Sequence, residues 1–314
     1  MSDLSQLLHF ITKKEKNSRV DFSPLTLCLG PNNLLYILSC SENYINVFDI
    51  KGNFKFNFGS YGSKNGQFNG PQGLCFGSNN LLYICDFDNH RIQVFDQYGN
   101  FKFTFGSFGS ENGQFKYPNK ICFGSNNLLY ITDLENHRIQ VFDQNGHFKF
   151  TFGLEGLEDG QFQFPYGLCF GSNNLLYICD SYNLRIQVFD MKGVFQFAFS
   201  LKKKSNNHSK YTCYDLCFGT NNLLYVCCKW NRYIKAFNQK GEFQFSFYPE
   251  KGKENSCFFF PYGLYFGPDH LLYICDINNH YIYILQHQKH QSLYQILAIS
   301  LFQTKNNNKK RKFY

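Results

Sequence analysis

The chain has 314 residues, with 31 Lys and Arg against 23 Asp and Glu, so its formal net charge is +8. Aromatic residues make up 19% of the sequence, which argues against an intrinsically disordered chain because such chains lack the apolar surface needed for folding. There is no apolar run of 18 residues and no signal-peptide pattern, so we expect no membrane span and a cytoplasmic location.

The first 23 residues contain one short apolar segment, residues 7–11. It precedes Phe22 and Pro24 at nearly the spacing that separates Phe152 from Phe164 and Pro165 further along. We therefore assign residues 1–23 to an N-terminal strand and an approach loop.

One unit then recurs along the chain. Its block Gly-x-x-Asn-Leu-Leu-Tyr-Ile, with small variations, has the tyrosine at Tyr36, Tyr83, Tyr130, Tyr177, Tyr225 and Tyr273. A fixed period of about 40–50 residues is typical of propellers and helical arrays. The repeats cover residues 24–70, 71–117, 118–164, 165–212, 213–260 and 261–300, and a basic tail follows at 301–314.

Each repeat contains four short strand-like runs. In residues 118–164 they are 121–123, 128–132, 138–142 and 148–152, rich in β-branched and aromatic residues and separated by Gly and Asn turns. The sequence therefore predicts an all-β, six-bladed β-propeller with four antiparallel strands per blade. Joining the chain termini would close the ring: we favour residues 7–11 over residues 293–297 as the outer strand of blade six.

The thirteen cysteines are expected to be reduced thiols. Their number is odd, no Cys-x-x-Cys occurs, and no secretory signal is seen. Most recur at two strand positions, which favours a role as small apolar core residues. The first-strand set is Cys28, Cys75, Cys122, Cys169 and Cys217, and the second-strand set is Cys85, Cys179, Cys227 and Cys275.

The repeat resembles the NHL family. The matching residues in the second repeat are Asp86, the stretch 89–96 (Asn-His-Arg-Ile-Gln-Val-Phe-Asp), Gly99, the Gly-Gln-Phe at 113–115 and Pro118. The resemblance covers about residues 24–300 and implies a six-bladed propeller used mostly as a binding platform, for single-stranded RNA in some members and proteins in others. The Cys/His zinc patterns of RING and B-box segments do not occur.

An Asp/Arg pair recurs after the second strand of blades two to four. It is expected to be a structural ion pair, because blades one and five lack both partners together and a single buried charge is costly. The pairs are Asp86/Arg91, Asp133/Arg138 and Asp180/Arg185.

The residues at the mouth of the central channel decide between binding and catalysis. The first ring is Leu25, Gln72, Asn119, Tyr166, Tyr214 and Tyr262, and the next is Thr26, Gly73, Lys120, Gly167, Asp215 and Gly263. One carboxylate and no histidine do not make a divalent-metal site. We therefore expect no metal, no cofactor and no catalytic residue.

The sequence favours a non-enzymatic platform that recognises protein or peptide partners at the channel mouth. Its candidate contacts are Gln72, Asn119, Lys120, Tyr166, Tyr214 and Tyr262, with Lys202, Lys203 and Lys204 in a basic loop. Exposed tyrosines are good contacts for protein partners and can also stack on bases. The alternative is that they have only a structural role and fill the channel. The other functions considered are single-stranded RNA binding, substrate recognition for a ubiquitin ligase in trans and, least favoured, a lactonase-like metal-dependent hydrolase.

The basic excess lies in two places. Residues 305–314 carry +5, ending in Lys309, Lys310, Arg311 and Lys312, and the three lysines at 202–204 carry +3. The rest of the chain is therefore neutral overall. The tail is expected to be a solvated end, with nuclear import or a nucleic-acid arm as the alternative.

Overall fold

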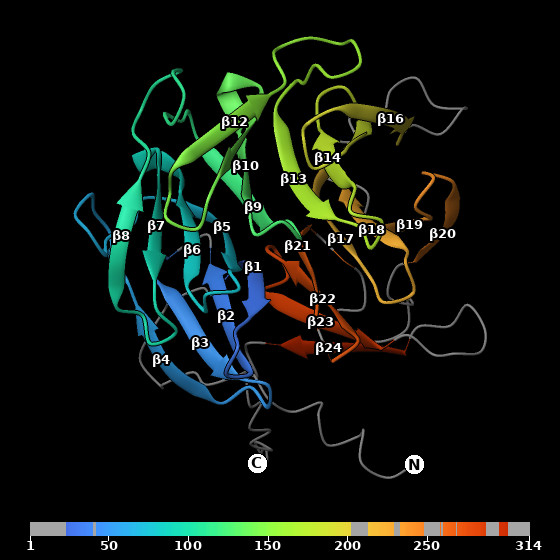
Figure 1. Ribbon diagram of the computed structural model, residues 1–314. Helices are drawn as coiled ribbons and strands as arrows, with labels where there is room; N and C mark the ends of the chain where they lie inside the picture. Colours follow the sequence, from blue (N-terminus) through green and yellow to red (C-terminus); the bar gives the residue numbers. More distant parts are fainter. Residues whose placement is uncertain are drawn as a thin grey trace, which may run out of the picture.

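Six four-stranded antiparallel sheets surround a central channel in the computed structural model (Figure 1). The structure describes residues 23–39, 42–201, 213–228, 233–247, 258, 260–267, 269–286 and 295–300. Within each sheet the strands follow chain order from the channel outward. The predicted six-bladed, all-β propeller is confirmed. In the described residues the helical elements are the 3-10 turns η2 (Phe87–Asn89) and η3 (Leu134–Asn136), and no helix there is long and apolar enough to cross a membrane.

The blades share one plan. The channel strands are β1 (Pro24–Leu29), β5 (Pro71–Phe76), β9 (Pro118–Phe123), β13 (Pro165–Phe170), β17 (Cys213–Phe218) and β21 (Pro261–Phe266). The second strands are β2 (Leu34–Ser39), β6 (Leu82–Asp86), β10 (Leu129–Asp133), β14 (Leu176–Asp180), β18 (Leu224–Cys228) and β22 (Leu271–Asp276). The third strands are β3 (Ile45–Asp49), β7 (Arg91–Phe95), β11 (Arg138–Phe142), β15 (Arg185–Phe189), β19 (Ile234–Phe237) and β23 (Tyr281–Gln286). The outer strands are β4 (Phe54–Phe58), β8 (Phe101–Phe105), β12 (Phe148–Phe152), β16 (Phe195–Ser200), β20 (Phe243–Phe247) and β24 (Gln295–Ser300).

The hydrophobic core lies between neighbouring blades. Tyr83 and Ile92 of blade two, for example, form one buried cluster with Leu129 and Ile131 of blade three. All five residues of β6 are buried, because a sheet covered on both faces cannot alternate between core and solvent. This packing explains why the second-strand runs are apolar almost without interruption.

Tyrosine hydroxyls also tie each blade to the next. The hydroxyl of Tyr83 in β6 donates to the carbonyl of Gln144 in the following blade at 2.7 Å, and Tyr130 does the same to Met191 at 2.7 Å. Both tyrosines are fully buried. A buried phenol normally finds such a partner, so the repeated tyrosine serves packing and polar satisfaction together.

The three Asp/Arg ion pairs form. The Asp133 carboxylate accepts from Arg138 Nε at 2.8 Å, and also from the Asn136 side chain, the Gln140 side chain and the Lys116 amide. Arg138 in turn donates to the carbonyls of Glu111 and Gln114 at 2.8 and 2.9 Å. Asp86/Arg91 and Asp180/Arg185 are both 2.7 Å pairs.

Blade one uses a different acid at the corresponding place. Glu42 accepts from Tyr44 Oη at 2.5 Å and from the Asn46 amide at 3.0 Å. The repeats do not reveal this replacement, because Glu42 lies three residues after Ser39, the position that corresponds to the aspartate of most other blades.

Blade six is completed by the C-terminal of the two candidate strands. Strand β24 pairs antiparallel with β23, from Tyr281↔Ser300 to Gln286↔Gln295. The preference for residues 7–11 at this position is therefore wrong, and that segment itself lies outside the described residues. The ring closes where β1 packs against β21 and β22, so the first and last blades lie side by side (Figure 1).

Candidate functional site

The channel strands bring a layer of alternating glycines and larger residues to the axis. Odd-numbered blades contribute Thr26, Lys120 and Asp215, and even-numbered blades contribute Gly73, Gly167 and Gly263. A Cβ on Gly73 would collide with the carbonyl oxygen of Asn119, and one on Gly167 would lie 2.8 Å from the carbonyl oxygen of Tyr214. The glycines therefore let the bulkier neighbours sit close to the axis.

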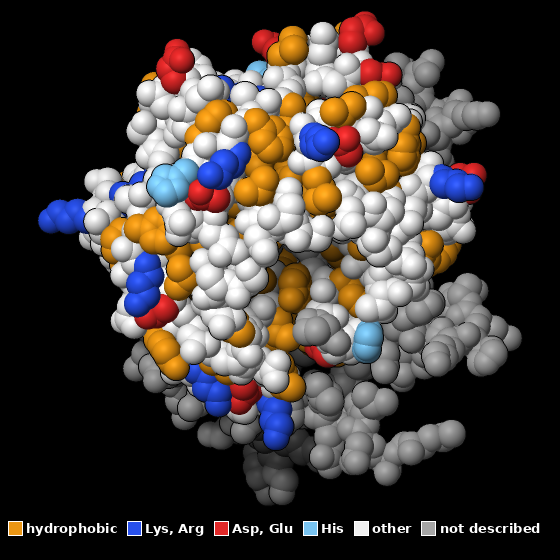
Figure 2. All heavy atoms as spheres, viewed as in Figure 1, with side chains coloured by type: hydrophobic (Ala, Val, Ile, Leu, Met, Phe, Trp, Pro, Cys, Tyr) orange, Lys and Arg blue, Asp and Glu red, His pale blue; other side chains and the backbone are white. Residues whose placement is uncertain are grey.

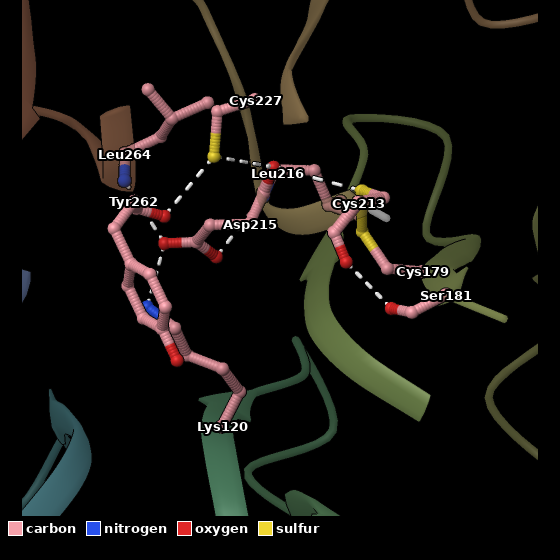
Figure 3. Close-up of a disulfide and its surroundings, with 9 residues drawn as sticks. All are labelled: Lys120, Cys179, Ser181, Cys213, Asp215, Leu216, Cys227, Tyr262 and Leu264. Atoms are coloured by element: carbon pink, nitrogen blue, oxygen red, sulfur yellow. Dashed lines mark hydrogen bonds and ion pairs between the residues drawn. A yellow bond between two sulfur atoms is a disulfide. The ribbon is translucent and has the colours of Figure 1, made fainter. Parts of the chain in front are cut away.

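The three larger residues meet inside the channel. Lys120 Nζ lies 2.6 Å from Asp215 Oδ2 and 3.0 Å from Thr26 Oγ1, so blades one, three and five are joined at one point. The side chain of Lys120 is 10% exposed and that of Asp215 is 4% exposed. Figure 3 shows Lys120 extending from β9 towards Asp215 beside the ring of Tyr262.

Backbone amides also hold the Asp215 carboxylate. Leu216 N donates to Oδ1 at 3.0 Å, and Leu264 N of the next blade donates to Oδ2 at 2.9 Å (Figure 3). Burial raises the pKa of Asp215, while Lys120 and the two amides act in the opposite direction. A carboxylate with a raised pKa beside an amine can exchange a proton with a bound substrate.

Tyrosines from blades four, five and six form a cluster next to this pair, with Tyr262 beside Lys120 (Figure 3). The rings of Tyr214 and Tyr262 are stacked at 4.6 Å between centroids, and Tyr166 meets Tyr214 edge to face at 5.1 Å. Tyr262 Oη also donates to Gln72 Oε1 of blade two at 3.4 Å. Burial raises the pKa of Tyr166 to about 12, so its phenol remains protonated at neutral pH.

The predicted contact residues thus lie together, but inside the channel mouth. Asn119, Lys120 and Tyr214 are only 2–8% exposed, whereas Gln72, Tyr166 and Tyr262 are partly exposed. Lys202, Lys203 and Lys204 lie outside the described residues, as do Lys309, Lys310, Arg311 and Lys312. The sequence shows the lysine and the aspartate in one layer but does not reveal that they pair. Their shared strand position can be read from the sequence, but the distance between their side chains across the channel cannot.

One pair of cysteines departs from the expectation of reduced core thiols. Cys179 of β14 and Cys213 of β17 form a disulfide, with their Cα atoms 5.8 Å apart, and link blade four to blade five (Figure 3). The expectation that the thiols are all reduced is therefore corrected. Cys213 stands where the channel strands of the other five blades have proline, which breaks the recurrence used to interpret the cysteines.

The remaining described cysteines are buried or half-buried thiols. Burial raises the pKa of the Cys122 and Cys169 thiols, for example, so they are protonated and weakly reactive. Within the described ranges no group of three or more His, Cys, Asp or Glu side chains could hold a metal ion. The described channel residues therefore do not fit a resident divalent metal.

Among the described side chains, the face in Figure 2 shows no continuous basic patch. Blue and red side chains lie close to one another around it, and hydrophobic side chains gather near the hollow at its centre. Ion pairs such as Lys102–Asp96 and Lys149–Asp143, both 2.8 Å, form between third and outer strands. Paired charges of this kind give little net attraction for a phosphate backbone.

Fold and repeat define the chain as a six-bladed propeller protein. It contains NHL repeats: the family model described as NHL repeat matches residues 68–95, 115–142 and 162–189. The predicted NHL resemblance is confirmed at these three positions. No curated protein matches the chain.

Solved structures of enzymes share the fold. A catalytically inactive virginiamycin B lyase from Staphylococcus aureus with quinupristin is 16% identical, with a TM-score of 0.65 over 92% of this chain and 88% of that one. The periplasmic gluconolactonase of Pseudomonas aeruginosa is 12% identical, with a TM-score of 0.62 over 88% and 86%. A gluconolactonase of Xanthomonas campestris is 11% identical, with a TM-score of 0.59 over 81% and 82%. At these identities the likeness shows the fold alone.

These neighbours overturn the expected non-enzymatic platform. That expectation, together with its RNA-binding and ligase alternatives, came from the usual role of NHL propellers. The structural neighbours are instead a lyase and lactonases that match most of the chain. The statement that the protein is not an enzyme therefore loses its support.

Proposed function

We propose that the protein is an enzyme that hydrolyses a small cyclic ester, a lactone, at the tyrosine-covered mouth of its central channel. The observation that carries the proposal is the Lys120–Asp215 pair, which is buried beneath the tyrosines at a separation of 2.6 Å. The equivalent positions of the other four blades are uncharged, so the fold does not require an ion pair here, and buried charges of this kind are typical of a functional site.

The residues divide into those that bind and those that react. The partly exposed Tyr166 and Tyr262, with Tyr214 packed between them, offer an apolar wall for a flat ring, and the side-chain amide of Gln72 offers hydrogen bonds that orient it. Beneath them Asp215 acts as the general base and takes a proton from the attacking water. The Lys120 ammonium stabilises the negative charge that develops on the carbonyl oxygen.

The reaction balances without another reactant. Water adds to the ester carbonyl, the ring C–O bond breaks, and the proton held by Asp215 passes to the departing alkoxide oxygen. The product is an open-chain hydroxy acid. The gluconolactonases that share the fold support this substrate class by their name, and this site would perform the reaction with its own acid and base.

The first test is hydrolysis of a panel of sugar, aliphatic and aromatic lactones by the purified full-length protein. Asp215→Asn and Lys120→Met should each lower kcat/KM by roughly 10²–10⁴-fold, the usual contribution of such groups. Lys149→Met is the matched control, because Lys149 lies on outer strand β12 and is 41% exposed. Equal rates in all four proteins, or no hydrolysis of any lactone, would refute the proposal.

The pH profile is a second readout. Because the base must be ionised and burial raises the pKa of Asp215, the rate should fall on acidification at a pH above the ordinary aspartate range. Asp215→Asn should abolish this acid limb. A profile that is flat down to about pH 4, near the ordinary aspartate pKa, would show that Asp215 is not the base.

A further inference from the structure

The junction between blades four and five differs from every other junction of the ring. The other five channel strands begin with Pro24, Pro71, Pro118, Pro165 and Pro261, whereas β17 begins with Cys213. Cys179 lies in the second-strand register that also holds Cys85, Thr132, Cys227 and Cys275. Among the described cysteines, the two that form a disulfide are therefore those that face each other across the junction of blades four and five.

Two groups of blade four hold the backbone of Cys213. One is Cys179 through the disulfide, and the other is Ser181, whose Oγ donates to the Cys213 carbonyl at 2.5 Å. All three residues are fully buried. At the position of Ser181, blades two, three and six have Phe87, Leu134 and Ile277, which cannot donate such a hydrogen bond from their side chains.

The attachment lies next to the reactive pair. The pairing of β17 with β18 shifts register between Cys213 and Asp215, so Cys213 anchors the bulge from which Asp215 points into the channel. On the other side of the same junction, a Cβ added to Gly167 would lie 2.8 Å from Asp215 Cα. The spacing of blades four and five therefore sets where the Asp215 carboxylate lies.

We propose that the Cys179–Cys213 disulfide is a positioning device that holds Asp215 against Lys120, which makes Cys213 a positioning residue for the site. The proposal rests on the proposed function for its catalytic consequence, but its structural part is independent of it. Reduction by a dithiol breaks the S–S bond, adds two electrons and two protons to give two thiols, and leaves the reagent as a cyclic disulfide. The junction would then be held by non-covalent contacts and the Asp215 carboxylate would lose its fixed place.

Hydrogen exchange of two amides tests this without an activity assay. Leu216 N and Leu264 N donate to the Asp215 carboxylate, so their protection reports its position. In the full-length protein, dithiothreitol treatment and Cys179→Thr should each speed exchange of both amides by about tenfold or more, with the other blades unchanged. Threonine is the residue that blade three itself has at this register.

Two further variants complete the design. Cys213→Pro restores the residue of the other five blades, which guards against simple misfolding, and should also show fast exchange that no longer responds to the reductant. Cys85→Thr changes the same register at another junction and should leave both amides protected and still sensitive to the reductant. Peptide mapping without reductant should find the Cys179–Cys213 cross-link.

The outcomes separate the two proposals. If the cross-link is missing, or if Cys179→Thr keeps full protection at Leu216 and Leu264, the positioning role is overturned. If the amides respond as expected but no lactone is hydrolysed in any state, the positioning role stands and the proposed function fails. If both hold, Cys179→Thr should lower kcat for the lactone with little change in KM, because the tyrosines that bind it are untouched.

Discussion

Arg138 illustrates how much a single buried charge depends on its partner. Its side chain is 12% exposed, while Asp133 is fully buried and has a pKa raised by burial. Arg138→Ala should therefore lower the free energy of unfolding by about 2–4 kcal/mol, because it leaves the carboxylate with its hydrogen bonds but without its counter-charge. Thermal and denaturant melts would measure the loss, and an unchanged melting temperature would contradict this interpretation.

The pH dependence of that loss follows from the sign of the pKa shift. A carboxyl whose pKa is raised in the folded state binds its proton more tightly there than in the unfolded chain, so acidification favours the folded state. The cost of Arg138→Ala should therefore be largest at neutral pH and shrink as Asp133 takes up a proton. Lys149→Ala removes an exposed partner of Asp143 and should change stability by less than about 1 kcal/mol.

At the scale of single residues, the sequence predicted which residues are important better than it predicted which residues they contact. Repetition alone was enough to pair Asp133 with Arg138, because their offset recurs in neighbouring blades. It was not enough for Lys120 and Asp215, which are 95 residues apart and meet only across the ring. Glu42 was missed for a related reason. It replaces the buried aspartate of most other blades as hydrogen-bond acceptor, but it lies at a different position in the repeat.

At the scale of the element, the channel strands of blades two, four and six have room for no side chain at the glycine of the central layer. Gly73→Ala would press a methyl group against the backbone of β9, so it should cost about 1–3 kcal/mol by overpacking. Gly113→Asn is the matched control, because its surroundings are open and asparagine tolerates the φ of +84° found there. Equal melting temperatures for the two variants would show that the neighbouring blade can move aside.

The strands themselves were largely predictable and the junctions were not. Four apolar runs separated by Gly and Asn turns define a blade because each turn is local in sequence. The junction between blades four and five depends instead on two residues 34 positions apart, and a cysteine in place of proline gives no local signal of its partner. Local sequence also could not decide which of two candidate segments, at opposite ends of the chain, forms the outer strand of blade six.

For the whole molecule, stability should depend strongly on the C-terminal residues, because they supply the outer strand of blade six. Removing residues 295–314 takes away β24 and uncovers β23, so the melt should shift to a lower temperature and become broader. Removing residues 1–15 should leave a single cooperative melt at nearly the original temperature. Circular dichroism and calorimetry would measure both truncations, and the reverse order of effects would return the closing strand to the N-terminus.

The alternation of small and large residues around the axis makes the unit of this ring a pair of blades. Each bulky residue at the centre faces a glycine on either side, and that order closes on itself only when the number of blades is even. A single inserted or deleted blade would bring two large side chains together or leave two glycines adjacent, with a clash or a hole as the result. Gene duplication could lengthen or shorten such a ring only in steps of two, about 94–96 residues at a time, unless the central layer changed with it.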